Sequence, residues 1–298
     1  MLAPHRRGGL GFVEKTIRNA AHFLQDTMVN EAVARRKGLL QAIEPRMKLI
    51  TVLAVIISVS IMRTPIMIWG IYGFTLLLAV ASSLSLVFFI KRVWLFVPLF
   101  SALIVIPALF NVVTPGEPVW TMLHLAQSHD LGPYHIPDSI AVTRQGILTA
   151  TIFIGRVSTS VSLAVLLTMT TLWSDLLQAL SVLKVPRIFI LILSMTYRYI
   201  ILLVHTLSDI HVARKSRTLH CGSTRSEQSW VASRMGYLLR RTYLMSQDVH
   251  NAMLSRGFSG DVRTLSPSPI RGYDYAWCIF VLLACIFSLV LDRTLVPW

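Results

Sequence analysis

The sequence predicts an all-α integral membrane protein with about five transmembrane helices and a cytoplasmic block of long helices. Of its 298 residues, 54% are hydrophobic and only 14% are charged, whereas soluble domains carry about 25% charged residues. Several apolar runs approach the roughly 20 residues needed to cross a bilayer. The formal net charge of +14 would suggest a nucleic-acid surface in a soluble protein. Here it indicates cytoplasmic segments that follow the positive-inside rule, and no nucleic-acid partner is expected.

Five apolar segments are predicted to cross the membrane. They are residues 49–62, 66–90, 94–113, 147–170 and 275–291. Pro65 separates the first two, because the residue before a proline avoids helical geometry. These two spans should therefore form a tight helical hairpin.

Basic residues predict the direction of the spans. Five of them precede the first span and two lie between the second and third: Arg35, Arg36, Lys37, Arg46, Lys48, Lys91 and Arg92. Both regions are expected in the cytoplasm, together with the N-terminus, since the first 47 residues show no cleaved signal peptide. The connection 114–145 contains three acidic residues and only Arg144 as a base, so it is expected outside.

A sixth apolar run, residues 188–204, carries Arg198 near its centre. A charge there costs about 2.5 to 3.5 kcal/mol on insertion scales. If this run crossed, residues 205–272, with ten Lys and Arg against four acidic residues, would lie outside. We therefore predict that residues 172–272 form a mostly helical cytoplasmic block, with 188–204 packed against the spans or lying along the interface.

Helical periodicity divides this block into three helices. "TTLWSDLLQALSVLKV" predicts a short amphipathic helix, and Pro186 suits the first turn of a second helix that continues to about residue 219. A third helix is expected over 228–256, ended by Gly257. The predicted organisation is a basic segment 1–47, four spans in 48–171 with the external loop 114–145, the helical block 172–272, and the last span with the C-terminus in 273–298.

Two arginines in this block are candidate partner-binding residues. Arg214 follows Ala213 in "VARKSR", and Arg256 follows Ser255 in "AMLSRG", where Ala252 precedes it by one turn. The alanines are small enough to let two helices approach where they cross, and a guanidinium can bond carboxylates or helix-terminal carbonyls in pairs. Arginines beside small residues are also common on solvated helices. Either motif alone indicates little, and their occurrence as a pair is the stronger signal.

Other polar residues favour structural interpretations. Arg156, inside the fourth span, is expected to bond neighbouring helices, and Met169 is expected to fill the core. His124, His129 and His135 have spacings of five and six that fit no compact metal motif. We expect an ordinary polar loop, no metal site and no cofactor. The chain is also expected not to be an enzyme, because it lacks the G-x-x-x-x-G-K-[ST] loop and any catalytic constellation.

With these residues in place, the chain resembles the transmembrane T component of energy-coupling-factor (ECF) importers, in particular the cobalt/nickel type of the CbiQ family. The resemblance covers most of residues 43–291. It rests on "EPRMKL", on "LLQALSVLKVPRIFILILSMTYRYI", and on "ARKSR" with "AMLSRGFSG" as two arginine-centred coupling motifs. The sequence departs from the family pattern in having Glu44 where Asp is usual, Lys215 where Ser is frequent, and about 40 unmatched N-terminal residues.

The resemblance implies a non-catalytic coupling subunit in a prokaryotic cell membrane. Its coupling helices would cross in an X and dock onto two cytoplasmic ATPases, with Arg214 and Arg256 each serving one ATPase. The membrane part would embrace a cobalt- or nickel-binding S component, with a small auxiliary membrane subunit as a further partner. The implied docking residues are Ala213, Arg214, Lys215, Ala252, Ser255, Arg256 and Gly257. The residues implied for structure or S-component packing are Pro45, Arg46, Arg156, Pro186, Tyr197 and Arg198. The alternatives are a coupling subunit for a vitamin importer and a self-sufficient metal permease.

Overall fold

The computed structural model describes residues 33–36, 38–95, 97–109, 118–124, 129–131, 134–136, 139–217, 224–260 and 271–295. These residues fall into two compact units. We call the described residues of 31–179 and 268–298 the bundle unit, and those of 180–267 the arm unit. The predicted four-part division of the chain stays a prediction.

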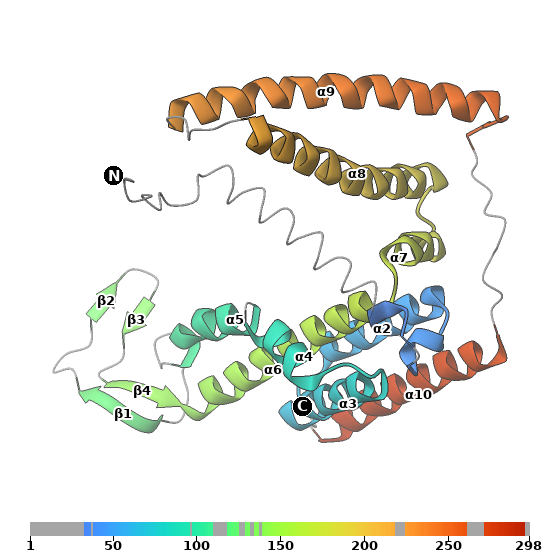
Figure 1. The fold of residues 1–298 in the computed structure, drawn as a ribbon. Helices are drawn as coiled ribbons and strands as arrows, with labels where there is room; N and C mark the ends of the chain where they lie inside the picture. Colours follow the sequence, from blue (N-terminus) through green and yellow to red (C-terminus); the bar gives the residue numbers. More distant parts are fainter. Residues whose placement is uncertain are drawn as a thin grey trace, which may run out of the picture. The chain divides into compact units, whose positions relative to one another are not determined.

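The elements of both units are drawn in Figure 1. The helices of the bundle unit are η1 (Leu40–Ala42), α2 (Pro45–Ile61), α3 (Pro65–Ala81), α4 (Leu86–Trp94), α5 (Val97–Val105), η2 (Ile106–Leu109), α6 (Arg144–Thr170), α7 (Trp173–Ala179) and α10 (Gly272–Leu295). Its strands are β1 (Pro118–His124), β2 (His129–Leu131), β3 (Tyr134–Ile136) and β4 (Ser139–Thr143). The arm unit contains η3 (Leu180–Leu183), α8 (Arg187–Arg217) and α9 (Thr224–Ser255).

The described residues are mostly helical, as predicted, but the expected loop 114–145 contains strands. β1 pairs with β4 and β2 pairs with β3, both antiparallel. The sequence shows why: "PVWTMLH" and "SIAVT" are rich in β-branched and aromatic residues, which favour strands. The all-α prediction is therefore wrong for this segment.

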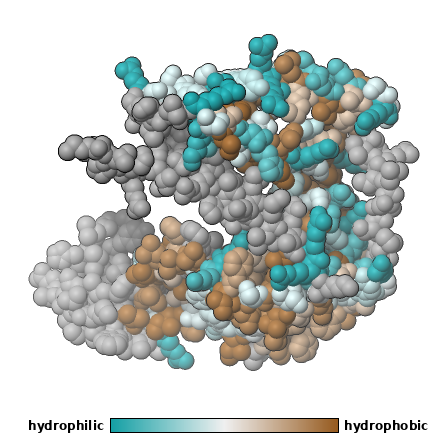
Figure 2. Space-filling model, viewed as in Figure 1, coloured by the Kyte–Doolittle hydropathy of each residue, from teal (hydrophilic) through white to brown (hydrophobic). Residues whose placement is uncertain are grey.

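Four described helices are long and apolar enough to cross a membrane, judged by length and composition. They are Leu86–Leu109, which runs through α4, α5 and η2, then Arg144–Thr170, Arg187–Arg217 and Gly272–Thr294. Pro65–Ala81 is apolar but shorter. Figure 2 shows hydrophobic side chains gathered over the bundle unit and hydrophilic ones along α9. Multiple apolar helices of this length are typical of a membrane protein.

The predicted second span, 66–90, is wrong in its extent. α3 ends at Ala81, and Ser83 adopts a left-handed conformation with φ of 56°. Residues 82–85, "SSLS", then lead into α4, because serines compete for the backbone hydrogen bonds that would continue a helix. Lys91 and Arg92 consequently lie in the last turn of α4 and not between spans.

α6 forms the centre of the bundle unit and packs closely on α3. Its inner face carries small residues, of which Ser158 and Ser162 are fully buried. A Cβ at Gly155 would lie 3.0 Å from Ile68 Cγ2, and the hydroxyls of Thr75 and Ser162 lie 3.1 Å apart. Between apolar helices in lipid, the hydrophobic effect does not drive association. Close packing of small residues and hydrogen bonds between hydroxyls hold such helices together instead.

The hydrogen bonds at the helix ends define how the helices of the bundle unit run. Lys48 near the start of α2 reaches Thr170 at the end of α6, whereas Met62 at the end of α2 receives a bond from Arg156, nearer the middle of α6. α2 and α6 are therefore antiparallel. Residues 44 and 63–64 contact Asp274 and Asp292, the two acidic residues of α10, so α2 and α10 run parallel.

It follows that three chain passages meet at one end of the bundle unit: the start of α2, the end of α6 and the start of α10. We call this the anchor end. The chain thus leaves α6 at Thr171 and enters α10 at Arg271 on the same end of the bundle unit, and α7, which follows Thr171, still belongs to that unit.

Candidate functional site

The first arginine-centred motif lies in the last turn of α8. Ala213, Arg214 and Lys215 belong to this helix, and the Arg214 guanidinium stacks on the ring of Trp230 in α9 at 4.3 Å from its centroid. Arg234 approaches the same ring from 5.8 Å. A guanidinium over an indole face is a favourable cation–π pair, so the carboxyl end of α8 lies beside the amino-terminal part of α9.

Further contacts show that α8 and α9 run antiparallel. They enclose an apolar groove of about 330 Å³ that is lined by Leu203, Val204, Leu207, Met235, Leu238, Leu239 and Thr242. The two long helices predicted from the sequence are confirmed. α8 has 31 residues and α9 has 32, which correspond to lengths of about 46 and 48 Å at 1.5 Å per residue.

The second arginine-centred motif lies at the end of α9. Ala252 and Ser255 are in its last turn, and Arg256 is exposed immediately after it. The helical path from Trp230 to Arg256 is about 39 Å, so the two arginines lie at opposite ends of the α8–α9 pair. The prediction that Ala213 and Ala252 share one crossing point is therefore wrong, because an antiparallel hairpin separates the ends of its two helices. Whether the helices cross in an X in a complex stays a prediction.

Gly257 ends α9 as the sequence predicts. Its φ is 81°, the Gly257 N–H donates to Leu254, and the Phe258 N–H donates to Met253. This is the Schellman arrangement, in which a residue in the left-handed conformation closes the last turn. Arg256 is therefore held on a defined helix terminus.

Gly257→Ala should lower the stability of the arm, because a side chain at this φ costs about 1 to 2 kcal/mol. Gly236→Ala is the matched control: Gly236 lies inside α9, no other side chain lies within 4 Å of the place that an added methyl group would take, and alanine there should stabilise the helix by about 0.5 to 1 kcal/mol. Thermal unfolding followed by circular dichroism should show shifts of opposite sign. Equal shifts would contradict the role of the left-handed conformation.

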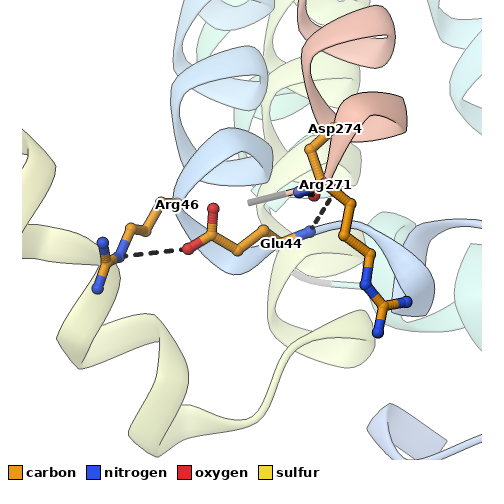
Figure 3. A network of polar contacts seen from close by, with 4 residues as sticks. All are labelled: Glu44, Arg46, Arg271 and Asp274. Atoms are coloured by element: carbon orange, nitrogen blue, oxygen red, sulfur yellow. Dashed lines mark hydrogen bonds and ion pairs between the residues drawn. The ribbon is translucent and has the colours of Figure 1, made fainter. Parts of the chain in front are cut away.

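The anchor end contains a network of buried polar groups (Figure 3). The Asp274 side chain, 1% exposed, accepts the Glu44 backbone N–H through Oδ1 at 3.0 Å and the Arg271 backbone N–H through Oδ2 at 2.8 Å. Asp274 thus serves the first turn of its own helix, as in a capping box, and the N-cap of α2. The Glu44 carboxylate pairs with Arg46 at 3.4 Å.

Lys48 supplies the third connection of this network. It is 2% exposed, and its Nζ donates to the Thr170 carbonyl and to the Thr171 hydroxyl, both at 3.0 Å. A cation in the first turns of α2 opposes the dipole of α2 but favours the carboxyl terminus of α6. The buried position of Lys48 is therefore explained by its hydrogen bonds to the carboxyl end of α6 and not by its place in α2.

Burial raises the pKa of the Glu44 carboxyl above its ordinary value of 4.5; the Arg46 charge opposes this shift and the Asp274 charge adds to it. The folded protein thus holds the Glu44 proton more tightly than the unfolded chain does. The stability that this group contributes is fully present below pH 4.5 and is lost as the pH rises through the raised pKa.

Glu44→Gln cannot ionise, so its thermal stability should improve relative to wild type as the pH rises from about 4 to about 7. The measurement is the difference in melting temperature between the two proteins across this range. A difference that stays constant or moves in favour of wild type would contradict the raised pKa of Glu44.

The opposite end of α2 has a matching carboxylate. Asp292, 7% exposed, accepts the backbone N–H groups of Arg63 and Thr64 at 3.1 and 2.9 Å and the Thr64 hydroxyl. Arg156 Nη2 donates to the Met62 carbonyl at 2.7 Å, which confirms the predicted structural hydrogen bond. The α2–α3 turn is thus held by α6 and α10 together.

The remaining predicted residues occupy ordinary structural positions. Pro45 is the first residue of α2, and Pro186 directly precedes α8, with the Phe189 N–H donating to its carbonyl. Tyr197 is half-buried and Arg198 exposed on α8, a helix with no buried residue. Met169 is 3% exposed in the core cluster of the bundle, as predicted.

Sequence reasoning missed Asp274 and Asp292 and counted Lys48 only as a cytoplasmic charge. A detectable signal was present, since ionisable residues at the ends of apolar spans are by default paired or functional. The histidines fall on strands: His124 on β1, His129 on β2 and His135 on β3. Among the described residues, no three His, Cys, Asp or Glu gather closely enough to hold a metal ion.

Comparison with known proteins identifies the family. Residues 36–266 match the model of the CbiQ family, described as cobalt transport protein. The chain is 33% identical to an uncharacterised protein of Methanocaldococcus jannaschii, over 94% of this chain and 92% of the relative. It is 28% identical to the cobalt transport protein CbiQ of Rhodobacter capsulatus, over 51% of this chain and 62% of that protein. The apolar helices and the match over most of its length show that the chain belongs to the CbiQ family, as a membrane component of cobalt transport.

Proposed function

We propose that the chain is the coupling subunit of an ECF-type importer for cobalt or nickel ions. In this proposal the bundle unit lies in the cell membrane beside an S component, and the arm unit meets two ATPase subunits in the cytoplasm. The observation that carries the proposal is the pair of basic motifs at opposite ends of the α8–α9 hairpin, about 39 Å apart along α9, with Arg214 half-buried and Arg256 exposed. Two separate sites suit two ATPase subunits.

The directions of the bundle helices support a cytoplasmic arm. Since Thr171 and Arg271 lie at the same end of the bundle, the chain between them crosses the membrane an even number of times or not at all. α8 is apolar enough to cross, but α9 carries six charged residues from Arg225 to Asp248 and is not among the candidate spans. If α8 alone crossed the membrane, the chain would reach Arg271 on the side opposite to Thr171, which the bundle does not allow.

The basic N-terminal segment enters α2 at the anchor end, and the positive-inside rule places that end in the cytoplasm. The arm then leaves and returns on the cytoplasmic side. ATP-driven movement of the two ATPases would change the angle of α8 and α9 and so move the S component. The chain itself would bind no nucleotide.

The test is cobalt uptake in a bacterial host that lacks its own cobalt importers. Radiolabelled cobalt should accumulate when the chain is expressed with its natural ATPase and S-component partners and not when it is expressed alone. Uptake by the chain alone would favour the metal permease. Accumulation of a vitamin without cobalt would favour the vitamin importer.

A single cysteine placed at Met235, which is 66% exposed on α9, tests the orientation in the same host. Before this experiment Cys221, Cys278 and Cys285 are replaced by serine. An impermeant thiol reagent should label the cysteine only after the membrane is opened. Labelling of intact cells would refute the cytoplasmic arm.

A further inference from the structure

The arginine of the first arginine-centred motif is stacked on an aromatic ring of the neighbouring helix. The Arg214 guanidinium lies 4.3 Å from the centroid of the Trp230 ring, and Arg234 approaches the same ring from 5.8 Å. Among aromatic side chains, tryptophan attracts a cation most strongly. The contact joins the last turn of α8 to the second turn of α9, so it lies wholly within the arm unit.

Core packing does not fix the direction of the Arg214 side chain. None of the residues of α8 is buried, and α8 and α9 enclose an apolar groove of about 330 Å³ between them. A long arginine side chain on such a helix samples many rotamers and loses this freedom when a partner binds it. Stacking on Trp230 restricts these rotamers within the arm itself.

The two motifs therefore fix their arginines by different means. Arg256 directly precedes the left-handed Gly257, so the backbone of the helix cap determines its position. Arg214 lies three residues before the end of α8, where a helix cap does not reach its side chain, and the Trp230 ring takes the place of the cap. A binding group that is ordered before its partner arrives loses less entropy on binding.

We propose that Trp230 is a positioning residue that orders Arg214 for binding to an ATPase subunit. This inference rests on the proposed function, since it names the residue that prepares one of the two docking arginines. Trp230 acts through Arg214, so its effect on the affinity for the ATPase disappears when the arginine is removed. Ordering one such side chain in advance is expected to raise the affinity by about 2- to 12-fold.

The experiment measures the affinity of the natural ATPase subunits for the full-length chain immobilised from detergent extracts. Trp230→Leu keeps an apolar side chain that favours helix but removes the aromatic face, and it should lower the affinity by about 2- to 12-fold. Trp230→Phe keeps a ring that attracts cations less strongly, so its affinity should lie between those of Trp230→Leu and wild type.

Tyr237→Leu is the matched control for loss of an aromatic side chain. Tyr237 belongs to the same helix and is 47% exposed. The same exchange of a ring for leucine there should leave the affinity at the wild-type value.

Combined variants separate positioning from loss of structure. With Arg214→Ala already present, Trp230→Leu should lower the affinity no further, because residues that act through one contact are not additive. With Arg256→Ala already present, Trp230→Leu should keep its full effect, since Arg256 lies at the other end of the α8–α9 pair.

The proposal is overturned if Trp230→Leu binds the ATPases like wild type. It is also overturned if Trp230→Leu lowers the affinity equally in wild type, Arg214→Ala and Arg256→Ala, which is the result expected when the arm as a whole is destabilised. A wild-type chain that captures no ATPase would instead refute the proposed function.

Discussion

Arg256→Ala should lower the affinity of the chain for its ATPase subunits by at least about 30-fold and reduce uptake accordingly. Arg256 is exposed and sits at the fixed end of α9, directly before the left-handed Gly257. Truncating one partner of a buried charged contact costs about 2 to 5 kcal/mol, and each 1.4 kcal/mol is about tenfold in affinity. The measurement is co-purification of the ATPases from detergent extracts, followed by binding to immobilised chain.

Arg214→Ala should have a smaller effect on ATPase binding. Its guanidinium already stacks on Trp230, so one of its faces is used within the arm and less of it is available to a partner. Arg240→Ala is the control, because Arg240 is an exposed arginine in the middle of α9. If the Arg214→Ala, Arg256→Ala double variant captures the ATPases like wild type while inserted in the membrane, the assigned docking residues are wrong.

The arm was predictable from sequence because its signals are local. Pro186 before α8, Gly257 after α9 and the three- and four-residue apolar spacing are read within a few turns of helix. The break at residues 82–85 was missed because the surrounding apolar run, 66–90, reads as one long span. Three serines in four residues were the available signal, since serine competes for the helix backbone.

The anchor end could not be predicted because its contacts join distant parts of the chain. Glu44 and Asp274 are 230 residues apart, and Lys48 and Thr170 are 122 apart. The sequence indicates that charged residues beside apolar helices need partners. Only the directions in which the helices run show which residues those partners are. The same holds for Ala213 and Ala252: their size suggested a shared crossing, and the antiparallel hairpin separates them.

Asp292→Ala should destabilise the bundle more than Gly257→Ala destabilises the arm. Three donors lose their buried acceptor at once: the N–H groups of Arg63 and Thr64 and the Thr64 hydroxyl. Each unsatisfied buried group costs about 1 to 3 kcal/mol. The three groups together therefore cost about 3 to 9 kcal/mol. Since 1 kcal/mol shifts the melting temperature of a 150- to 250-residue protein by about 2 to 4 °C, a fall of at least about 6 °C is expected.

Cys285, 9% exposed in α10, reports this transition when a thiol-reactive fluorophore is present during heating, with Cys221 and Cys278 replaced by serine. Asp292→Asn keeps one oxygen acceptor and should fall less than Asp292→Ala. Ser288→Ala provides a comparison on the same helix, since the Ser288 hydroxyl donates to the Cys285 carbonyl within α10. Asp292 is the contact by which α10 holds the α2–α3 turn. An unchanged melting temperature in Asp292→Ala would therefore mean that apolar packing alone keeps α2 and α10 parallel. The even number of crossings inferred for the arm would then rest on the contacts of Lys48 and Asp274 alone.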